Sequence, residues 1–245
     1  ESSPPLTAKF RLSSRTLASL NENMSVPLQH RLNRPVQKSY PHIEGLYLLI
    51  RSTGLAYIDE SGKKPTLRAD EAVVNSWKQL NETERYFTLL ETWLVRASPE
   101  IVESGTGRLF ISSHARWYRL FQDVPADGLR ASDGKNLLED LRYWPGAYNL
   151  ALMELFGLVE ITKGPLVEGE GWQIAEVKRT QFGDAVLATV TISEDEVDPF
   201  VFADNFEPPS FGFWQTRLQP YFPQWKKNLE NQDEGYRAGQ HIFTV

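Results

Sequence analysis

Two glycines, Gly54 and Gly157, each follow an apolar helical run and precede a short strand, and this repeated junction is the strongest constraint on the fold. A glycine directly after a helix commonly adopts the left-handed conformation that ends it. After each glycine, the sequence predicts a strand, a turn-rich tip, a second strand and a capped helix. The shared order indicates two modules of similar fold in one chain.

The expected elements follow from apolar periodicity and from capping residues. The first module is expected to contain helices over 16–24, 43–53 and 70–80 and strands at 55–59 and 65–67. Asn81 and Glu84 fit a capping box that starts the next helix. Further along, we expect helices over 114–123, 129–141 and 147–156, strands at 158–162 and 172–177, and a helix from Thr180 through Leu187.

The expected fold class is α+β, mainly helical, with tandem winged-helix-like modules and a C-terminal aromatic arm. The first module spans 1–80 with an extended N-terminal lead-in, the second spans 81–191, and residues 192–245 combine an acidic linker with the arm. The chain does not begin with Met and ends on a strand-like run at 241–245, so we expect a fragment that leads into an absent C-terminal domain. The alternative is one irregular α+β domain whose elements recur by chance.

Composition excludes several kinds of site. The sequence has no Cys, which rules out disulfides, thiolate catalysis and Cys-type zinc sites. The four His residues do not have metal-ligand spacing, and His114 after two serines is interpreted as a surface residue at a helix start. We therefore expect no catalytic residue, no metal and no cofactor. The sequence has neither a signal peptide nor a long apolar run, which favours a cytoplasmic protein without membrane contact.

Three stretches carry a resemblance to a bacterial family. They are QKSYPHIEGLY at 37–47, LNETERYFTLLE at 80–91 and LQPYFPQW at 218–225. They are similar to the region that precedes the conserved domain in the plasmid open-reading-frame-three-like family, first named from an agrobacterial Ri plasmid. In that family, the next segment runs into a strand resembling residues 239–245 and continues as an α/β domain. The resemblance implies that the chain stops where that domain begins, and it implies no activity for any residue.

The net charge of −6 is unevenly distributed. Residues 1–70 hold 10 Lys and Arg and 6 Asp and Glu, whereas residues 71–245 hold 16 and 26. Because phosphate contacts need cations, duplex DNA would meet the first module. The leading hypothesis is a non-catalytic, winged-helix-type DNA-binding or DNA-associated module, with a helix ahead of Tyr40 facing the duplex. The candidate residues are Arg31, Arg34, Lys38, Arg51, Lys63 and Lys64, with Arg142, Lys163, Lys178 and Arg179 as secondary candidates.

A protein-interaction scaffold is the alternative function. The acidic second module opposes the approach of phosphate, and winged helices also bind proteins. The partner would be the absent C-terminal domain or another protein. Its candidate contacts are Phe211, Phe213, Trp214, Tyr221, Phe222 and Trp225, unless this aromatic segment packs back on the core.

Overall fold

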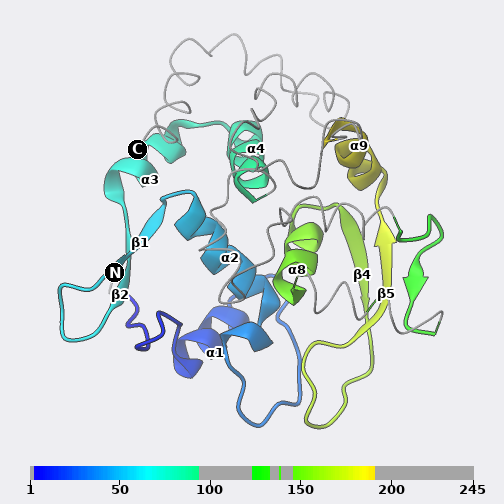
Figure 1. The fold of residues 1–245 in the computed structure, drawn as a ribbon, viewed down its shortest axis with the longest axis horizontal. Coiled ribbons are helices and arrows are strands. Elements are labelled where there is room, and N and C mark those ends of the chain that lie inside the picture. The colour runs from blue at the N-terminus through cyan, green and yellow to red at the C-terminus, as the bar shows by residue number, and fades with distance from the viewer. Residues whose placement is uncertain (1–2, 94–122, 133–137, 139–145, 191–245) are drawn as a thin grey trace, which may run out of the picture.

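The structure is a computed structural model that describes residues 3–93, 123–132, 138 and 146–190, shown in Figure 1. Within these ranges, the chain is α+β, with six α-helices and small antiparallel sheets. The helix predicted over 114–123, the acidic linker and the aromatic arm lie outside the described residues, apart from Asp123. The predicted module boundaries therefore stay predictions.

The first group of elements covers the N-terminal third of the chain. It contains α1 (Ser14–Glu22), the 3₁₀ helix η1 (Gln37–Ser39), α2 (Pro41–Ser52), β1 (Ala56–Asp59), β2 (Thr66–Ala69) and α3 (Glu71–Gln79). β1 and β2 form a two-stranded antiparallel hairpin in which Ala56 pairs with Ala69. Between α1 and Tyr40 the only helix is the short η1, so the prediction of a DNA-facing helix near Arg31, Arg34 and Lys38 is wrong. Pro35 and Pro41 restrict the backbone of this segment.

The second group begins with α4 (Glu82–Glu91), where Asn81 and Glu84 form the predicted capping box. It continues with β3 (Leu129–Arg130), α8 (Ala147–Leu155), β4 (Val159–Lys163), β5 (Ile174–Arg179) and α9 (Gln181–Val190). The three strands form an antiparallel sheet in the order β3-β5-β4. The indole of Trp93, just after α4, donates to Asn149 Oδ1 of α8 at 2.8 Å.

The predicted repeat of element order is confirmed, and the structure adds a backbone hydrogen bond that the two repeats share. Gly54 and Gly157 both have positive φ, 72° and 71°, directly after α2 and α8. The residue after each glycine accepts a backbone hydrogen bond from the residue that caps the next helix. These bonds join Asp70 N to Leu55 O at 3.0 Å and Thr180 N to Leu158 O at 3.1 Å.

Each hairpin also gains an extended neighbour from earlier in the chain. β3 pairs with β5 through Leu129 and Val177, and the lead-in bridges β2 through Pro5 and Thr66. The helix predicted over 129–141 is therefore wrong at its start. Gly128 has a φ of 101°, and the apolar Leu129 side chain is buried against the sheet instead of lying on a helix face.

The two groups share one hydrophobic core, in which α2 and α8 lie side by side at the centre of Figure 1. Buried Leu48 and Leu49 come from α2, and buried Leu150 and Met153 come from α8. The helices approach closely because Gly45 has no side chain. A Cβ at this position would lie 2.8 Å from Cγ of Leu152.

Candidate interaction surfaces

The β1–β2 hairpin presents the first set of predicted cations. Its tip begins with a turn in which Asp59 Oδ1 accepts a hydrogen bond from Ser61 N at 2.9 Å. This bonding to Ser61, together with nearby Arg68, lowers the pKa of Asp59. Lys63 and Lys64 follow in the exposed tip, and neither has an ion-pair partner in the described part of the chain. Both ammonium groups are therefore available to a ligand.

The β4–β5 hairpin is acidic and is covered by a segment of the first group. Gly169 N donates to Arg31 O at 3.0 Å, and Arg31 N donates to Glu170 O at 3.2 Å. The Arg31 guanidinium lies 3.6 Å from the carboxylate of Glu168. Both side chains are more than half exposed, so the ion pair itself adds little stability. The two backbone bonds fix the segment around Arg31 to this hairpin.

The other predicted cations are dispersed. Arg51 stacks over the ring of Tyr47 at 5.4 Å, and Arg179 lies 3.1 Å from Asp184. Lys163 and Lys178 are exposed on β4 and β5, and Lys178 pairs across the sheet with Glu160. Arg142 lies outside the described residues, as do the six aromatic residues proposed for partner binding.

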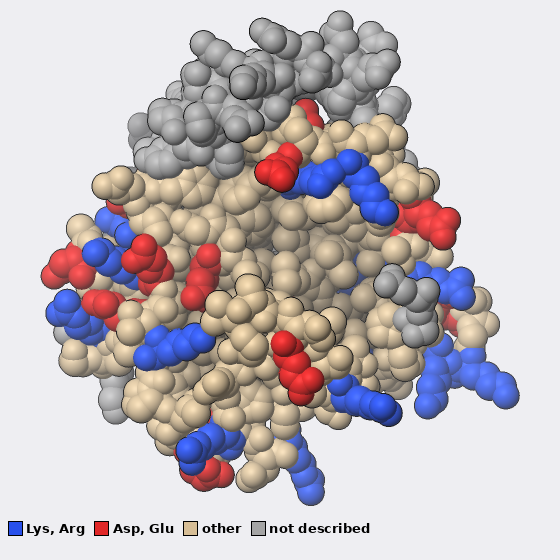
Figure 2. Space-filling model, turned by 180° about the vertical axis from the view of Figure 1, so that it is seen from behind, with Lys and Arg blue, Asp and Glu red and all other residues tan. Residues whose placement is uncertain are grey.

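Charged side chains lie mainly around the edge of the face that Figure 2 shows. Red and blue side chains are mixed at the left of this face, several Lys and Arg side chains lie close together at its lower right edge, and the middle is mostly uncharged. The first group is nevertheless basic, since residues 3–80 hold 11 Lys and Arg and 6 Asp and Glu, a net charge of +5. Residues 146–190 hold 3 and 6, a net charge of −3. These two described ranges therefore carry net charges of opposite sign.

Most of the side chains of α2 and α8 are buried in the core. On α2, the residues from Ile43 to Leu49 are buried except Leu46, which is 36% exposed. On α8, residues 149–153 are all buried, and Leu155 is 43% exposed. Leu46, in the middle of α2, and Leu155, the last residue of α8, are apolar and lack the amide or guanidinium groups that read base edges.

A buried polar network holds the start of α2 to the N-terminal lead-in. The carboxylate of Glu44, a residue 2% exposed, lies 2.5 Å from the Arg11 guanidinium and also accepts a hydrogen bond from Gln37 Nε2. Gln37 Oε1 in turn accepts from Leu12 N at 2.7 Å. This network fixes η1 against the lead-in. Sequence reasoning missed it because no spacing pattern relates Arg11, Gln37 and Glu44.

A second polar contact connects α2 to α8. His42 Nε2 and Glu154 Oε2 are 2.6 Å apart, and both side chains are partly shielded from solvent. The His42 ring also meets the ring of Trp172 edge-on, with centroids 5.0 Å apart. His42 thus positions Trp172, which is 5% exposed. These contacts join residues 112 positions apart in the chain, and no local sequence signal could reveal them.

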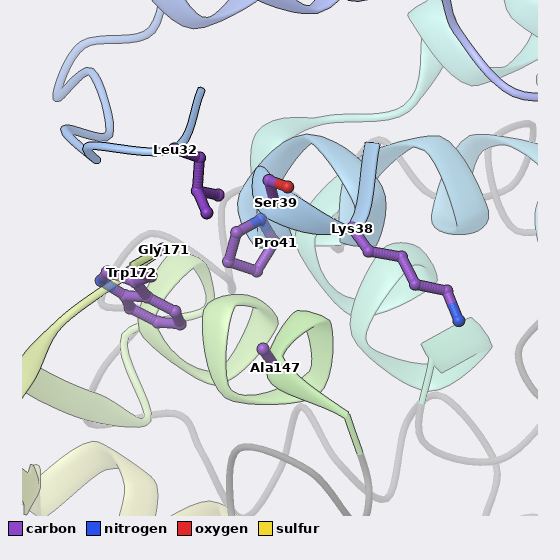
Figure 3. A pocket seen from close by; sticks show the side chains of 7 residues that line it. All are labelled: Leu32, Lys38, Ser39, Pro41, Ala147, Gly171 and Trp172. Carbon is purple, nitrogen blue, oxygen red and sulfur yellow. The ribbon is translucent and has the colours of Figure 1, made fainter. Parts of the chain in front are cut away.

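Beside this contact lies a hollow of about 240 Å³. Its apolar walls come from both groups: Leu32 and Pro41 from the first, Ala147 and Trp172 from the second. Figure 3 shows that these side chains surround one space, whereas the Lys38 side chain extends away from Trp172. Ser39 and Gly171 complete the lining. The hollow lies where the two helices begin, because Pro41 and Ala147 are their first residues.

Two properties bear on the kind of site that this chain can hold. No cluster of three or more His, Asp or Glu able to hold a metal ion occurs among the described residues. Over the same ranges, no helix is both long enough and apolar enough to cross a bilayer. Comparisons with protein-family models, with curated proteins and with solved structures found no match to this chain.

Proposed function

We propose that this chain is a non-catalytic protein-interaction scaffold built from two winged-helix-like units. The observation that carries the proposal is the packing of α2 against α8. This packing buries most of the two helices with which such units would read DNA. A scaffold needs rigidly joined units with exposed surfaces between and around them, and it needs no polar recognition helix. Its partner is another protein or a C-terminal domain beyond this chain.

The winged-helix interpretation is supported by the arrangement of strands around each hairpin. In both groups, an early extended segment pairs with the second hairpin strand, and a helix directly precedes the hairpin. In this interpretation, α2 and α8 occupy the place of the recognition helix, which enters the major groove of DNA in helix-turn-helix proteins. Gly45 and Leu152 instead bring the two helices into direct contact.

Affinity capture with the immobilised chain tests the scaffold. A bacterial lysate is treated with nuclease before capture, and each captured protein is then purified and titrated against the chain. We expect at least one partner with a Kd of about 10 μM or tighter, which corresponds to roughly 7 kcal/mol of binding free energy. The proposal fails if every protein that the chain captures from an untreated lysate is absent from the nuclease-treated one, because nucleic acid would then have bridged them.

DNA association is a second candidate function, supported by the +5 charge of residues 3–80. Lys63 and Lys64 stand together at an exposed hairpin tip and lack ion-pair partners among the described residues. Such a tip suits contacts with phosphates, which position a protein without reading sequence. DNA binding of this kind would be sequence-independent and strongly weakened by salt.

Fluorescence anisotropy with labelled duplex DNA at low and high salt tests this candidate. The double variant Lys63→Ala with Lys64→Ala is expected to lose most of the binding seen at low salt. Lys163→Ala with Lys178→Ala is the matched control, because it removes two exposed lysines from the other hairpin. Equal losses in both variants, or no binding at low salt, would contradict a DNA contact at the first hairpin.

A further inference from the structure

We infer that the hollow between Trp172, Pro41, Ala147 and Leu32 docks an acidic peptide segment of a partner protein through one aromatic side chain. This inference rests on the proposed scaffold function and names the chemistry of the partner. Its geometry comes from the two groups together, since neither supplies all the walls. A partner bound there would contact both units at once.

Small residues leave the hollow open. Gly171 has no side chain, and a Cβ there would meet only Leu32 Cδ1, at an ordinary contact distance of 3.5 Å. Ala147 contributes one methyl group at the start of α8. The Trp172 ring packs against the ring of His42 in an edge-to-face arrangement, and His42 also contacts Glu154 on α8. The apolar walls are thus fixed before a ligand arrives, which reduces the entropy lost on binding.

The size of the hollow favours a single anchoring side chain. Sites for drug-sized molecules typically occupy about 300–1,000 Å³, which is larger than this hollow of about 240 Å³. Aromatic side chains inserted into such pockets are common energetic anchors of protein interfaces. A phosphate backbone gains nothing from apolar walls, so the lining favours a peptide over nucleic acid.

The charge around the hollow determines the flanking residues of the partner. Lys38 is one of the residues that line the hollow, and Figure 3 shows its side chain extending away from Trp172. Arg34 is exposed in the same segment. Neither side chain has an ion-pair partner in the described ranges, whereas neighbouring Arg31 faces Glu168. Acidic residues on either side of the aromatic anchor would complement these two cations.

Anisotropy titration of a fluorescein-labelled peptide tests the inference with the whole chain. The probe is a short peptide with one central Trp flanked by Glu residues, at an ionic strength of about 0.15 M. We expect saturable binding that is lost when the peptide Trp is replaced by Ser and when its Glu residues are replaced by Lys. Absence of binding by the Trp and Glu peptide would overturn the inference.

Protein variants locate the site. Lys38→Glu is expected to weaken peptide binding about tenfold or more, equivalent to about 1.4 kcal/mol. Lys78→Glu makes the same charge change at an exposed residue of α3 and is expected to leave binding unchanged. Gly171→Leu places a side chain into the hollow and is expected to abolish binding. Equal weakening by both Lys variants, or full binding by Gly171→Leu, would place the peptide elsewhere and overturn the inference.

The same variants distinguish failure of the docking site from failure of the proposed scaffold function. A protein captured by the wild-type chain that binds Lys38→Glu and Gly171→Leu equally well would overturn the docking site and leave the scaffold standing. Loss of every protein partner after nuclease treatment would overturn both. Duplex DNA that competes with the peptide and is itself weakened by Lys38→Glu would assign the cations to phosphate binding instead.

Discussion

The carboxylate of Glu44 is removed from water and held by two partners, Arg11 and Gln37. Glu44→Ala leaves both partners without their acceptor, and Arg11 is only about one-quarter exposed. We expect a loss of about 2–3 kcal/mol in the free energy of unfolding, near the lower end for a broken buried pair because Arg11 regains some hydration. Urea denaturation measures this loss.

The control for this prediction is Arg68→Ala, which breaks an exposed ion pair. Arg68 lies 3.0 Å from Asp59, but its side chain is more than half exposed to solvent. The expected loss is about 0.5 kcal/mol or less. Equal losses in the two variants would show that the environment of Glu44 is no more shielded than the hairpin surface.

Tyr86 makes stability depend on pH in the alkaline range. Its hydroxyl donates to Phe156 O at 2.6 Å, and burial raises its pKa above the ordinary value of 10.0. Above about pH 10, the unfolded chain has lost this proton while the folded chain retains it, so unfolding releases a proton. The free energy of unfolding must therefore fall as pH rises beyond about 10.

Tyr86→Phe isolates this contribution, since Phe has no proton to lose. At neutral pH, the variant is expected to be about 1 kcal/mol less stable, because the carbonyl of Phe156 loses its donor. Between about pH 9 and 11, its stability should decline less steeply than that of the wild type. Identical slopes in urea melts across this range would contradict a raised Tyr86 pKa.

Capping residues were predictable at this scale because their signals are local. Gly54, Gly157 and the Asn81–Glu84 box each depend on residues within one helical turn, and the structure places all of them as expected. The pairing of His42 with Glu154 was not predictable. It depends on two helices that are distant in sequence, and His42 has no neighbouring residue that indicates a partner.

The elements were predictable where one periodicity dominated. The strand β3 was mistaken for the start of a helix because the apolar Leu129 fits one face of an amphipathic helix as well as a buried position in a sheet. Residues 129–131 form a strand because they make backbone hydrogen bonds with the edge of β5 that β4 leaves unpaired. The sequence of a short strand does not indicate which distant strand it pairs with.

The contact between α2 and α8 predicts a specific sensitivity at Gly45. Gly45→Val would place its side chain against Leu152 Cγ and against the backbone oxygen of Tyr148, 3.1 Å from the new Cβ. We expect the free energy of unfolding to fall by about 1–3 kcal/mol, which is typical when a side chain is added to a packed core. The midpoint of urea denaturation measures it.

Gly62→Val is the matched control for this substitution. A Cβ at Gly62 would meet nothing nearer than Lys64 O at 3.6 Å, in an exposed hairpin tip. Gly62→Val should change the free energy of unfolding by no more than about 0.5 kcal/mol. If Gly45→Val were equally mild, α2 and α8 would be separable without cost, and the rigid scaffold would lose its main support.

For the whole molecule, the sequence predicted two similar groups but not how they meet. The repeat was visible in element order, and the charge difference was visible in composition. The hollow beside Trp172 was not predictable, because its walls come from four segments that only the folded chain brings together. For the same reason, Lys38 was predicted as a DNA contact, with no indication that it stands beside an apolar surface.

The shared core predicts that residues 1–80 are unstable alone. The buried face of α2, with Leu48 and Leu49, would lose its α8 neighbours and become exposed to water. We expect this fragment to lack a cooperative thermal transition by circular dichroism and to bind a dye for apolar surfaces, whereas the full chain shows a single transition. A sigmoidal melt of the fragment near that of the full chain would contradict this dependence.

The close approach at Gly45 also limits how this protein can diverge. A lineage that acquires a side chain at position 45 must reduce or reshape the residue at position 152, since the two share one space. Paired substitutions at these positions are therefore expected among homologues, and single enlargements at 45 should be rare. Although the two halves have the same order of elements, substitutions at their contact must be compatible with each other, so the two halves are expected to evolve together.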